Sequence, residues 1–359
     1  MNKRFEKIIG TGGIGVGLLF ETSDNRTLGR NESRLVHLSD AKDYCKQHIV
    51  LHYAASLMPD NTKIFPVGFI GRDAYGASLL KDMERVGMSM QFVNYSESTP
   101  TTISFCLQYP DKDGCNITAS NGASDLVTPD YIRMALDEIG VDQNTLLAAI
   151  PEVRVEARIE MLSYGHAHGG YCVLSIPEAE AYIFEQFKVF QYCDLLSVNE
   201  REAAALMPGA DNVLALISQL YQKVSVHNPH VQLLVTCGKN GAYIAQSDRI
   251  ELIPPLSVNA INTTGAGDAF LGGVIAGLAG GLPLQKGHND QTFAASPLTS
   301  AAELGTLCAG MAVESPDTIA SHVHSAGILA RIVDHQWQQS AQFRSLLGNH
   351  GQNDTLFTF

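Results

Sequence analysis

Short apolar segments that alternate with helix-like segments constrain the fold of this chain more than any other feature. Five of them have the length and composition of buried strands and end in glycine or a small polar residue: 7–13, 63–71, 171–176, 193–199 and 231–238. Helices are expected between them, over 76–86, 130–139, 178–190, 200–207 and 211–223. Such alternation predicts βαβ units, an α/β fold and a mostly parallel sheet, with ligands at the carboxyl ends of the strands.

Residues 100–122 break this alternation. Apolar residues alternate with polar ones before a PDKDG turn, and a second short strand follows, which predicts a hairpin with one apolar face. Residues 25–40 are expected to add one or two strands. Antiparallel pieces inserted in an α/β domain are typical of a lid or a dimer clasp. Because exposed strand edges need cover, a homodimer through these segments is a further expectation.

Composition limits the class of protein. The 359 residues are 45% hydrophobic and 17% charged, which is typical of one large compact domain with a smaller appended piece. The net charge of −13 argues against a nucleic-acid partner. The seven cysteines include no CxxC pair, so reduced thiols in the cytoplasm are expected. Glycines interrupt the longest apolar run, 269–284, which therefore predicts a buried helix and no membrane span.

The stretch INTTGAGDAFLGG, residues 261–273, carries the first chemical signal. Three small residues, Gly265, Ala266 and Gly267, precede an apolar helix, so free N–H groups and the positive end of the helix dipole would converge on an anion. Asp268 would then accept the proton of a substrate hydroxyl as a general base. The alternative is that Asp268 only interacts favourably with the helix dipole.

Two further motifs follow expected strands. In NERE, Asn199 and Glu202 either cap a helix or orient waters on a magnesium–phosphate complex. In TCGKNG, the glycines favour a tight hairpin, while Thr236 and Gly238 also occupy the strand end where a nucleotide would lie.

Other patterns point elsewhere. GTGGIG, residues 10–15, fits the dinucleotide fingerprint, but Gly17 and the turn residues from Ser23 make a poor first helix, which argues against NAD. His48 and His52 share a helix face without the glutamate of HExxH, so buried histidines or substrate contacts are favoured over zinc. No Walker A motif is present in the sequence.

Together the motifs resemble those of the ribokinase (PfkB) family of sugar and nucleoside kinases. NTTGAGDAF (262–270) is similar to the D-T-x-G-A-G-D signature, and GFIGRDAYG (68–76) to G-x-x-G-x-D-x-x-G. NERE and TCGKNG are similar to N-x-x-E and T-x-G-x-x-G. The motifs occur in the family's order, so the resemblance covers roughly residues 5–325.

The resemblance implies a three-layer α/β/α kinase domain over 1–334, with lid strands from about 20–40 and 97–121 and a peripheral tail over 335–359. It implies ATP and Mg²⁺ as co-substrates. It assigns Asp268 as general base and Gly265–Gly267 as anion hole. Glu202 would serve the metal through water. The residues near the nucleotide would be Asn199, Thr236 and Gly238.

The sequence departs from the family at the substrate end. Asn262 replaces the first acid of the signature, which helps to hold a monovalent cation in some members, so dependence on K⁺ stays open. Gly15 falls where the family has a substrate carboxylate, and 45–52 lack the family's glycine pair. The candidates for a changed acceptor site are Glu21, Lys42, Lys46, His48 and His52.

The resulting hypothesis is an ATP-dependent kinase that acts on a hydroxyl of a sugar-like or nucleoside-like small molecule. The rival hypothesis is a catalytically weak sensor of a nucleotide or metabolite on the same fold. The altered substrate end favours the sensor, whereas Asp268 favours the kinase, because a binding protein does not need a general base. The sequence does not identify the acceptor.

Overall fold

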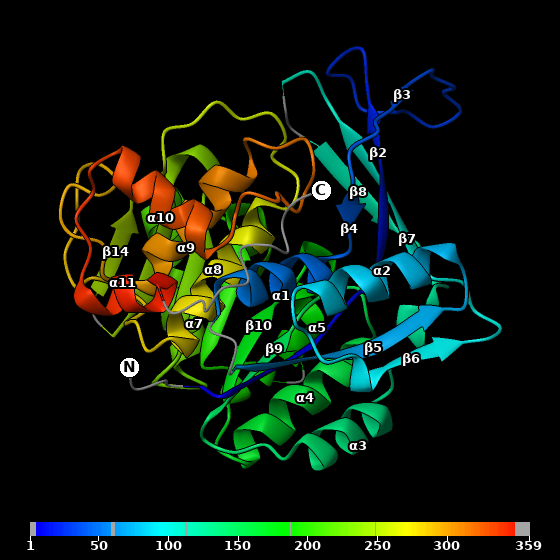
Figure 1. Cartoon of the computed structure of the whole chain (residues 1–359), viewed down its shortest axis with the longest axis horizontal. Helices are drawn as coiled ribbons and strands as arrows, with labels where there is room; N and C mark the ends of the chain where they lie inside the picture. The colour runs from blue at the N-terminus through cyan, green and yellow to red at the C-terminus, as the bar shows by residue number, and fades with distance from the viewer. Residues whose placement is uncertain (1–4, 59–61, 112–113, 187, 248, 349–359) are drawn as a thin grey trace.

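The computed structural model describes residues 5–58, 62–111, 114–186, 188–247 and 249–348. A nine-stranded sheet forms its centre (Figure 1). In spatial order its strands are β14 (Arg249–Ile253), β13 (Ala242–Gln246), β12 (Gln232–Thr236), β11 (Leu195–Asn199), β10 (Tyr171–Ser175), β9 (Thr145–Ala149), β1 (Lys7–Thr11), β5 (Lys63–Gly71) and β6 (Val93–Ser96). Pairing is parallel from β12 to β6, and β13 pairs antiparallel with β12 and β14. The expected mostly parallel sheet is confirmed.

Helices cover both faces of this sheet (Figure 1). One face carries α1 (Lys46–Leu57), α2 (Ala74–Arg85), α8 (Ala266–Ala279), α9 (Ala301–Ala312), α10 (Ser325–Asp334) and α11 (Ala341–Gly348). The other carries α3 (Pro129–Ile139), α4 (Val155–Ala167), α5 (Ala181–Gln186), α6 (Glu200–Leu206) and α7 (Val213–Ser225). Each face has its own apolar core, so the chain forms the expected three-layer α/β/α fold.

All five expected strands are present as β1, β5, β10, β11 and β12, and four expected helices as α2, α3, α6 and α7. The helix expected over 178–190 is shorter, because α5 is flanked by single 3₁₀ turns at 178–180 and 189–192. Strand β9 and helix α4 were not expected. β9 lies between β1 and β10 in the middle of the sheet, so the omission matters for the site.

Helix α8 packs between α1 and α9 at the centre of its layer. Its glycines allow this close contact: a Cβ on Gly272 would lie 2.6 Å from the Val50 carbonyl oxygen of α1, and one on Gly273 would lie 2.7 Å from Cys308 Sγ of α9. Every α8 residue from Ala269 to Ala279 is buried, which agrees with the expectation of a core helix. Within the described ranges, no helix combines the length and the apolar character required to cross a bilayer.

The C-terminal segment is less peripheral than expected. In α11, Phe343 and Leu346 are fully buried and join the core formed by α1, α8 and α9. Trp337 also stacks edge-on against Phe293. Residues 335–348 therefore belong to the packed domain, since burying such side chains stabilises the fold. Residues 349–359 lie outside the described part of the chain.

A second sheet forms the lid. Its strands are β2 (Gly15–Glu21), β3 (His37–Leu38), β4 (Asp43–Tyr44), β7 (Thr102–Gln108) and β8 (Gly114–Thr118). β7 and β8 pair antiparallel, which confirms the expected hairpin, although residues 112 and 113 of its turn lie outside the described residues. Only two residues of 25–40 are in a strand. The chain passes from β1 directly into β2. GTGGIG is therefore followed by a lid strand, whereas the dinucleotide fingerprint requires a helix at that position, so the structure argues against dinucleotide binding there.

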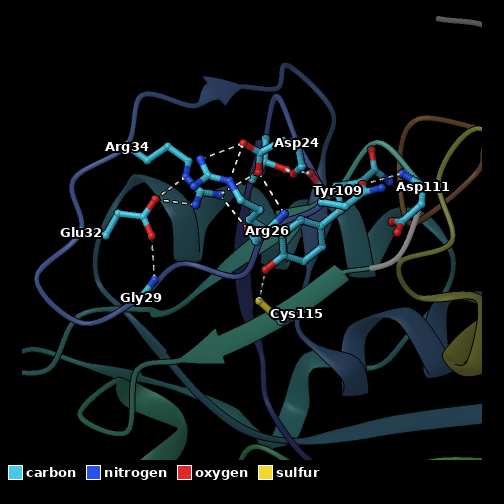
Figure 2. Close-up of polar contacts among 11 residues, drawn as sticks. Asp24, Arg26, Gly29, Glu32, Arg34, Tyr109, Asp111 and Cys115 are labelled. Carbon is cyan, nitrogen blue, oxygen red and sulfur yellow. Dashed lines mark hydrogen bonds and ion pairs between the residues drawn. The ribbon is translucent and has the colours of Figure 1, made fainter.

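The loop between β2 and β3 is held by charged side chains (Figure 2). Arg34 donates to the Arg26 carbonyl oxygen at 2.7 Å and pairs with Asp24 and Glu32. Asp24 also accepts from the Arg26 amide at 2.9 Å. The Glu32 carboxylate in turn accepts from the Gly29 amide at 2.9 Å. These interactions link residues 24–34 across a loop that has few strand hydrogen bonds, and they engage the Asp24 carboxylate within the loop.

Candidate active site

The turn before α8 presents open backbone at the edge of the sheet. Gly265 has φ 76°, a left-handed conformation that glycine adopts without strain, and no side chain caps the helix there. The Ala266 amide donates to the Thr263 carbonyl oxygen at 3.3 Å. Gly267 is exposed, and a Cβ at that position would have no atom within 4 Å. The space beside Gly267 is therefore accessible to an anion approaching the positive end of α8.

Asp268 lies in the first turn of α8, next to Lys46 in the first turn of α1. Asp268 Oδ2 is 4.0 Å from Lys46 Nζ, and the two side chains are 16% and 35% exposed. Burial raises the pKa of Asp268, while the charge of Lys46 opposes that rise. Asp268 is thus a partly desolvated carboxylate that stays accessible, and its environment makes it a better proton acceptor than a free aspartate.

Lys46 is the positive centre of an acidic cluster, which is defined here as Asp43, Glu152, Glu202 and Asp268. The charge of Asp268 is the main cause of the raised pKa of Lys46, followed by Glu152 and Glu202 after the opposing effect of burial. Burial also raises the pKa values of Asp43, Glu152 and Glu202. Four carboxyl groups around one ammonium leave an excess of negative charge, and a divalent cation would compensate it.

Glu152 joins this cluster from a loop at the carboxyl end of β9. Its Oε2 accepts from the Lys46 backbone amide at 2.9 Å, and its Oε1 accepts from the hydroxyl of Thr118 in the lid at 3.2 Å. Its φ of 76° is unusual for a residue with a side chain and stores strain. Glu152 was not predicted from the sequence, although an acid separated by one proline from the apolar run TLLAAI is a usable signal.

Asn199 and Glu202 form a reciprocal cap at the start of α6. The Asn199 side chain accepts from the Glu202 amide at 2.9 Å, and Glu202 accepts from the Asn199 amide at 2.8 Å. The capping alternative is therefore correct for the geometry. Glu202 also lies within electrostatic range of Lys46 and Asp268, so the cap holds in place one carboxylate of the acidic cluster.

Among the described residues, no group of three or more His, Cys, Asp and Glu side chains forms a ready-made metal site. Mg²⁺ does not require such a cage, because it usually keeps several waters and takes other ligands from substrate phosphates. Asn199 and Glu202 fit the water-mediated role that the resemblance implies.

Thr236 and Gly238 lie at the neighbouring strand end. Thr236 is the register partner of Asn199, so these two residues end adjacent parallel strands. The Cys237 amide donates to the Gly241 carbonyl oxygen at 2.8 Å, and Gly238 and Gly241 have φ values of 54° and 89°. The hairpin alternative thus describes the local geometry, and it leaves Gly238 exposed at the carboxyl edge of the sheet.

The remaining acceptor candidates are dispersed. Glu21 is exposed at the end of β2 and pairs in register with His37 and Gln108 in the lid, and Lys42 is exposed before β4. His48 is fully buried, and its ring packs 4.5 Å from that of Tyr44 and 5.8 Å from that of His52. The Tyr44 hydroxyl contacts Asp82 of α2 at 3.3 Å.

The candidates thus fall into two groups. His48 packs on Tyr44, which contacts Asp82 of α2, and His52 lies within electrostatic range of Arg85 of α2. Lys46 is the candidate that the structure brings to Asp268.

The surroundings of Gly15, where the family has a substrate carboxylate, leave no room for a side chain. A Cβ at Gly15 would lie 2.2 Å from the Thr102 carbonyl oxygen and 2.8 Å from Cys45 Sγ. The space that a side chain would need is therefore filled by β7 and by the residue before α1. Nearby, the buried Asp43 occupies the space beside Gly17, where a Cβ would lie 1.7 Å from its Oδ2.

Comparison with known proteins identifies the family to which the chain belongs. The chain matches the profile of the pfkB family carbohydrate kinase over residues 49–325. Ribokinase of Bacillus subtilis is 31% identical over 225 residues, which are 62% of this chain and 70% of that protein. Ribokinase of Schizosaccharomyces pombe is 28% identical over 231 residues, or 63% and 70% of the two chains.

Solved structures show the same fold. Ribokinase from Giardia lamblia superposes with a TM-score of 0.75 at 18% identity, covering 92% of this chain and 99% of that one. Arabidopsis thaliana ribokinase complexed with ribose and ATP has a TM-score of 0.63 at 17% identity, covering 91% and 98%. A nucleoside kinase from Burkholderia thailandensis in complex with inosine has a TM-score of 0.69 at 19% identity, covering 91% and 98%.

The chain therefore belongs to the pfkB family of carbohydrate kinases, and its class of activity is phosphotransfer.

Proposed function

We propose that this chain transfers the γ-phosphoryl group of ATP to a hydroxyl of a sugar-like or nucleoside-like small molecule. The observation that carries the proposal is the position of Asp268, a partly buried acid beside Lys46 at the open first turn of α8. A base, a nearby cation and the amides of a helix N-terminus are groups that suit phosphoryl transfer, because its catalysis consists mainly of positioning and electrostatic stabilisation.

In the proposed reaction, the acceptor hydroxyl lies against Asp268, which takes its proton. The hydroxyl oxygen forms a bond to the γ-phosphorus as the bond from that phosphorus to the β,γ-bridging oxygen breaks, and ADP leaves. The amides around Gly265–Gly267 and the charge of Lys46 stabilise the negative charge on the transferred group. Glu202 would hold Mg²⁺ through water, and the ion would supply positive charge to the phosphates, while Asn199, Thr236 and Gly238 would line the nucleotide side.

The acceptor site in this proposal is formed by Lys46 and Glu152, which flank Asp268, with Thr118 contributed by the lid. A lysine and a carboxylate side by side suit the hydroxyl groups of a polyol, since one donates hydrogen bonds and the other accepts them. Gly15 has no room for a side chain, so the contacts to the acceptor differ from those of the family pattern. Glu21 is exposed at the end of β2, where it is the register partner of Gln108.

A sensor without turnover is the second candidate, because the acceptor end has changed. The test is to incubate the protein with Mg-ATP and a panel of sugars, polyols and nucleosides, and to follow ADP release. We expect turnover by the wild type and a loss of about 10²–10⁴-fold in Asp268→Asn. ATP affinity measured by calorimetry should be retained. A wild type that binds ATP but phosphorylates nothing across the panel would favour the sensor.

We also propose a homodimer through the lid. Register pairs place Phe20 with Leu38, and Phe105 with Ile117, on the face of the lid opposite to Gln108. Leu38, Phe105 and Ile117 are 52%, 45% and 68% exposed, and the rings of Phe20 and Phe105 stack at 6.2 Å. A contiguous apolar sheet face of this kind is suited to cover by a second copy of the same lid.

A further inference from the structure

A buried amide group immediately precedes the anion-hole turn. Asn262 is 3% exposed, and both ends of its side-chain amide are bound to backbone. Oδ1 accepts from the Thr264 amide at 2.9 Å, and Nδ2 donates to the Pro316 carbonyl oxygen at 2.8 Å. Because one partner can only donate and the other can only accept, the orientation of the amide is fixed. Asn262 thus joins the 262–264 turn to the loop after α9.

The lid reaches the same amide. Gln108, the last residue of β7, is 7% exposed and donates from Nε2 to Asn262 Oδ1 at 2.9 Å. This is a hydrogen bond between side chains 154 residues apart in the chain, and it ends three residues before Gly265. The hydrogen bonds of Asn262 therefore connect three segments: the end of a lid strand, Thr264 immediately before the anion-hole residue Gly265, and the loop at Pro316.

These residues do not fit a monovalent cation. A cation site needs oxygen atoms with free lone pairs and favours a carboxylate. Asn262 is uncharged, its Oδ1 already accepts two hydrogen bonds, and its Nδ2 presents a hydrogen to the Pro316 carbonyl oxygen. That carbonyl oxygen therefore already has a donor.

We propose that the Gln108–Asn262 amide pair holds the anion-hole turn without a monovalent cation and couples its geometry to the position of the lid. Asn262 and Gln108 are positioning residues in this proposal, since they act through Gly265–Gly267. The coupling to phosphate binding rests on the proposed kinase function. The cation independence rests on the hydrogen bonds alone and has its own test.

The first experiment measures thermal unfolding of the full nucleotide-free chain in KCl and in choline chloride at equal ionic strength. The wild type should unfold at the same temperature in both salts. Asn262→Asp replaces the donor facing Pro316 by a carboxylate oxygen. In choline chloride this variant should unfold at a temperature at least about 3 °C below that of the wild type, and in KCl it should regain part of that difference, because K⁺ can bind the new carboxylate. A wild-type midpoint that rises in KCl as much as that of Asn262→Asp overturns the proposal.

The second experiment tests the coupling to the lid. Gln108→Leu removes the donor but keeps an apolar side chain of similar volume, and it should weaken ATP binding by about tenfold while the chain stays folded. Gln246→Leu makes the same substitution in β13, at the end of the sheet opposite to Thr236, and as the matched control it should retain wild-type affinity. Unchanged ATP affinity in a folded Gln108→Leu protein refutes the coupling.

The two experiments separate the two proposals. A wild type that binds no ATP would contradict the kinase function and a nucleotide sensor together, and the coupling would fall with them. The thermal comparison of KCl with choline chloride needs no nucleotide and would still decide whether the amide pair replaces a cation.

Discussion

Lys46 and Asp268 lie 222 positions apart in the chain, and their charged groups meet at 4.0 Å because α1 and α8 begin at the same edge of the sheet. The pair balances two opposing effects. Burial favours the neutral form of Asp268, and the ammonium of Lys46 favours the carboxylate. A base that must be ionised to accept a proton therefore depends on its neighbouring lysine.

The pH profile of Lys46→Met tests this dependence. Loss of the ammonium removes the interaction that lowers the pKa of Asp268, so the pKa rises further above the usual aspartate range. Because activity is lost as pH falls through that pKa, the acid limb of kcat/KM should move to higher pH. A folded Lys46→Met enzyme with lower activity but an unmoved acid limb would show that Lys46 acts only on the substrate.

Gly267→Ala separates stability from phosphate binding. A helical glycine-to-alanine change should stabilise the fold by about 0.5–1 kcal/mol, and a Cβ at this position meets no other atom within 4 Å. The methyl group would occupy the open space assigned to a phosphate, so turnover should drop by about tenfold or more. Urea unfolding and ADP release measured on the same preparation test both halves. Unaltered turnover would remove Gly267 from the anion hole.

The two histidines of α1 should make the fold sensitive to acid. Burial lowers the pKa of His52 to about 4 and that of His48 well below its usual value. The unfolded chain gains these protons below about pH 6.5, whereas the folded chain stays neutral, so stability falls as pH drops from 6.5 toward 4. His52→Leu should therefore lose less stability than the wild type between pH 7.5 and pH 5, by about 2 kcal/mol.

Urea unfolding at the two pH values gives this difference directly. His37→Leu changes an exposed histidine of the lid and should follow the wild type. Equal losses in all three proteins would mean that His52 titrates normally in the folded state.

The apolar face of the lid makes a prediction about assembly. Ile117→Glu places a charge at the centre of that face and should convert a dimer to a monomer, as measured by sedimentation equilibrium. Val226→Glu is the control, because Val226 is 80% exposed at the end of α7, away from the lid. A wild type that sediments as a monomer at micromolar concentration contradicts the lid dimer.

Local patterns were sufficient to predict most of the central sheet and the residues at two strand ends, Asn199 and Thr236. Strand β9 was harder to recognise, because TLLAA is rich in residues that also favour helices, and it becomes a strand through pairing on both sides with β1 and β10. Glu152 was missed with it. The packing of α11 was not predicted either, because the sequence after residue 335 is mostly polar, although three apolar side chains of α11 are buried in the core.

The acceptor site could not be predicted from the sequence for a different reason. The sequence places His48 and Lys46 in the same helix, but only packing decides which face of α1 meets α8 and which meets α2. Lys46 precedes His48 by two residues, or a little over half a helical turn, so the two side chains point to different neighbours. Contacts between distant segments, such as Gln108 with Asn262, leave no pattern in a single sequence.

The tight packing of α8 determines where motion can occur in this molecule. A helix whose glycines touch α1 on one side and α9 on the other cannot shift without disrupting both contacts. The packing of α8 therefore holds Asp268 and the turn before it in a fixed position. We therefore expect closure over a reactant to come from the lid sheet. The turnover rate should then depend on how fast the lid opens to release products.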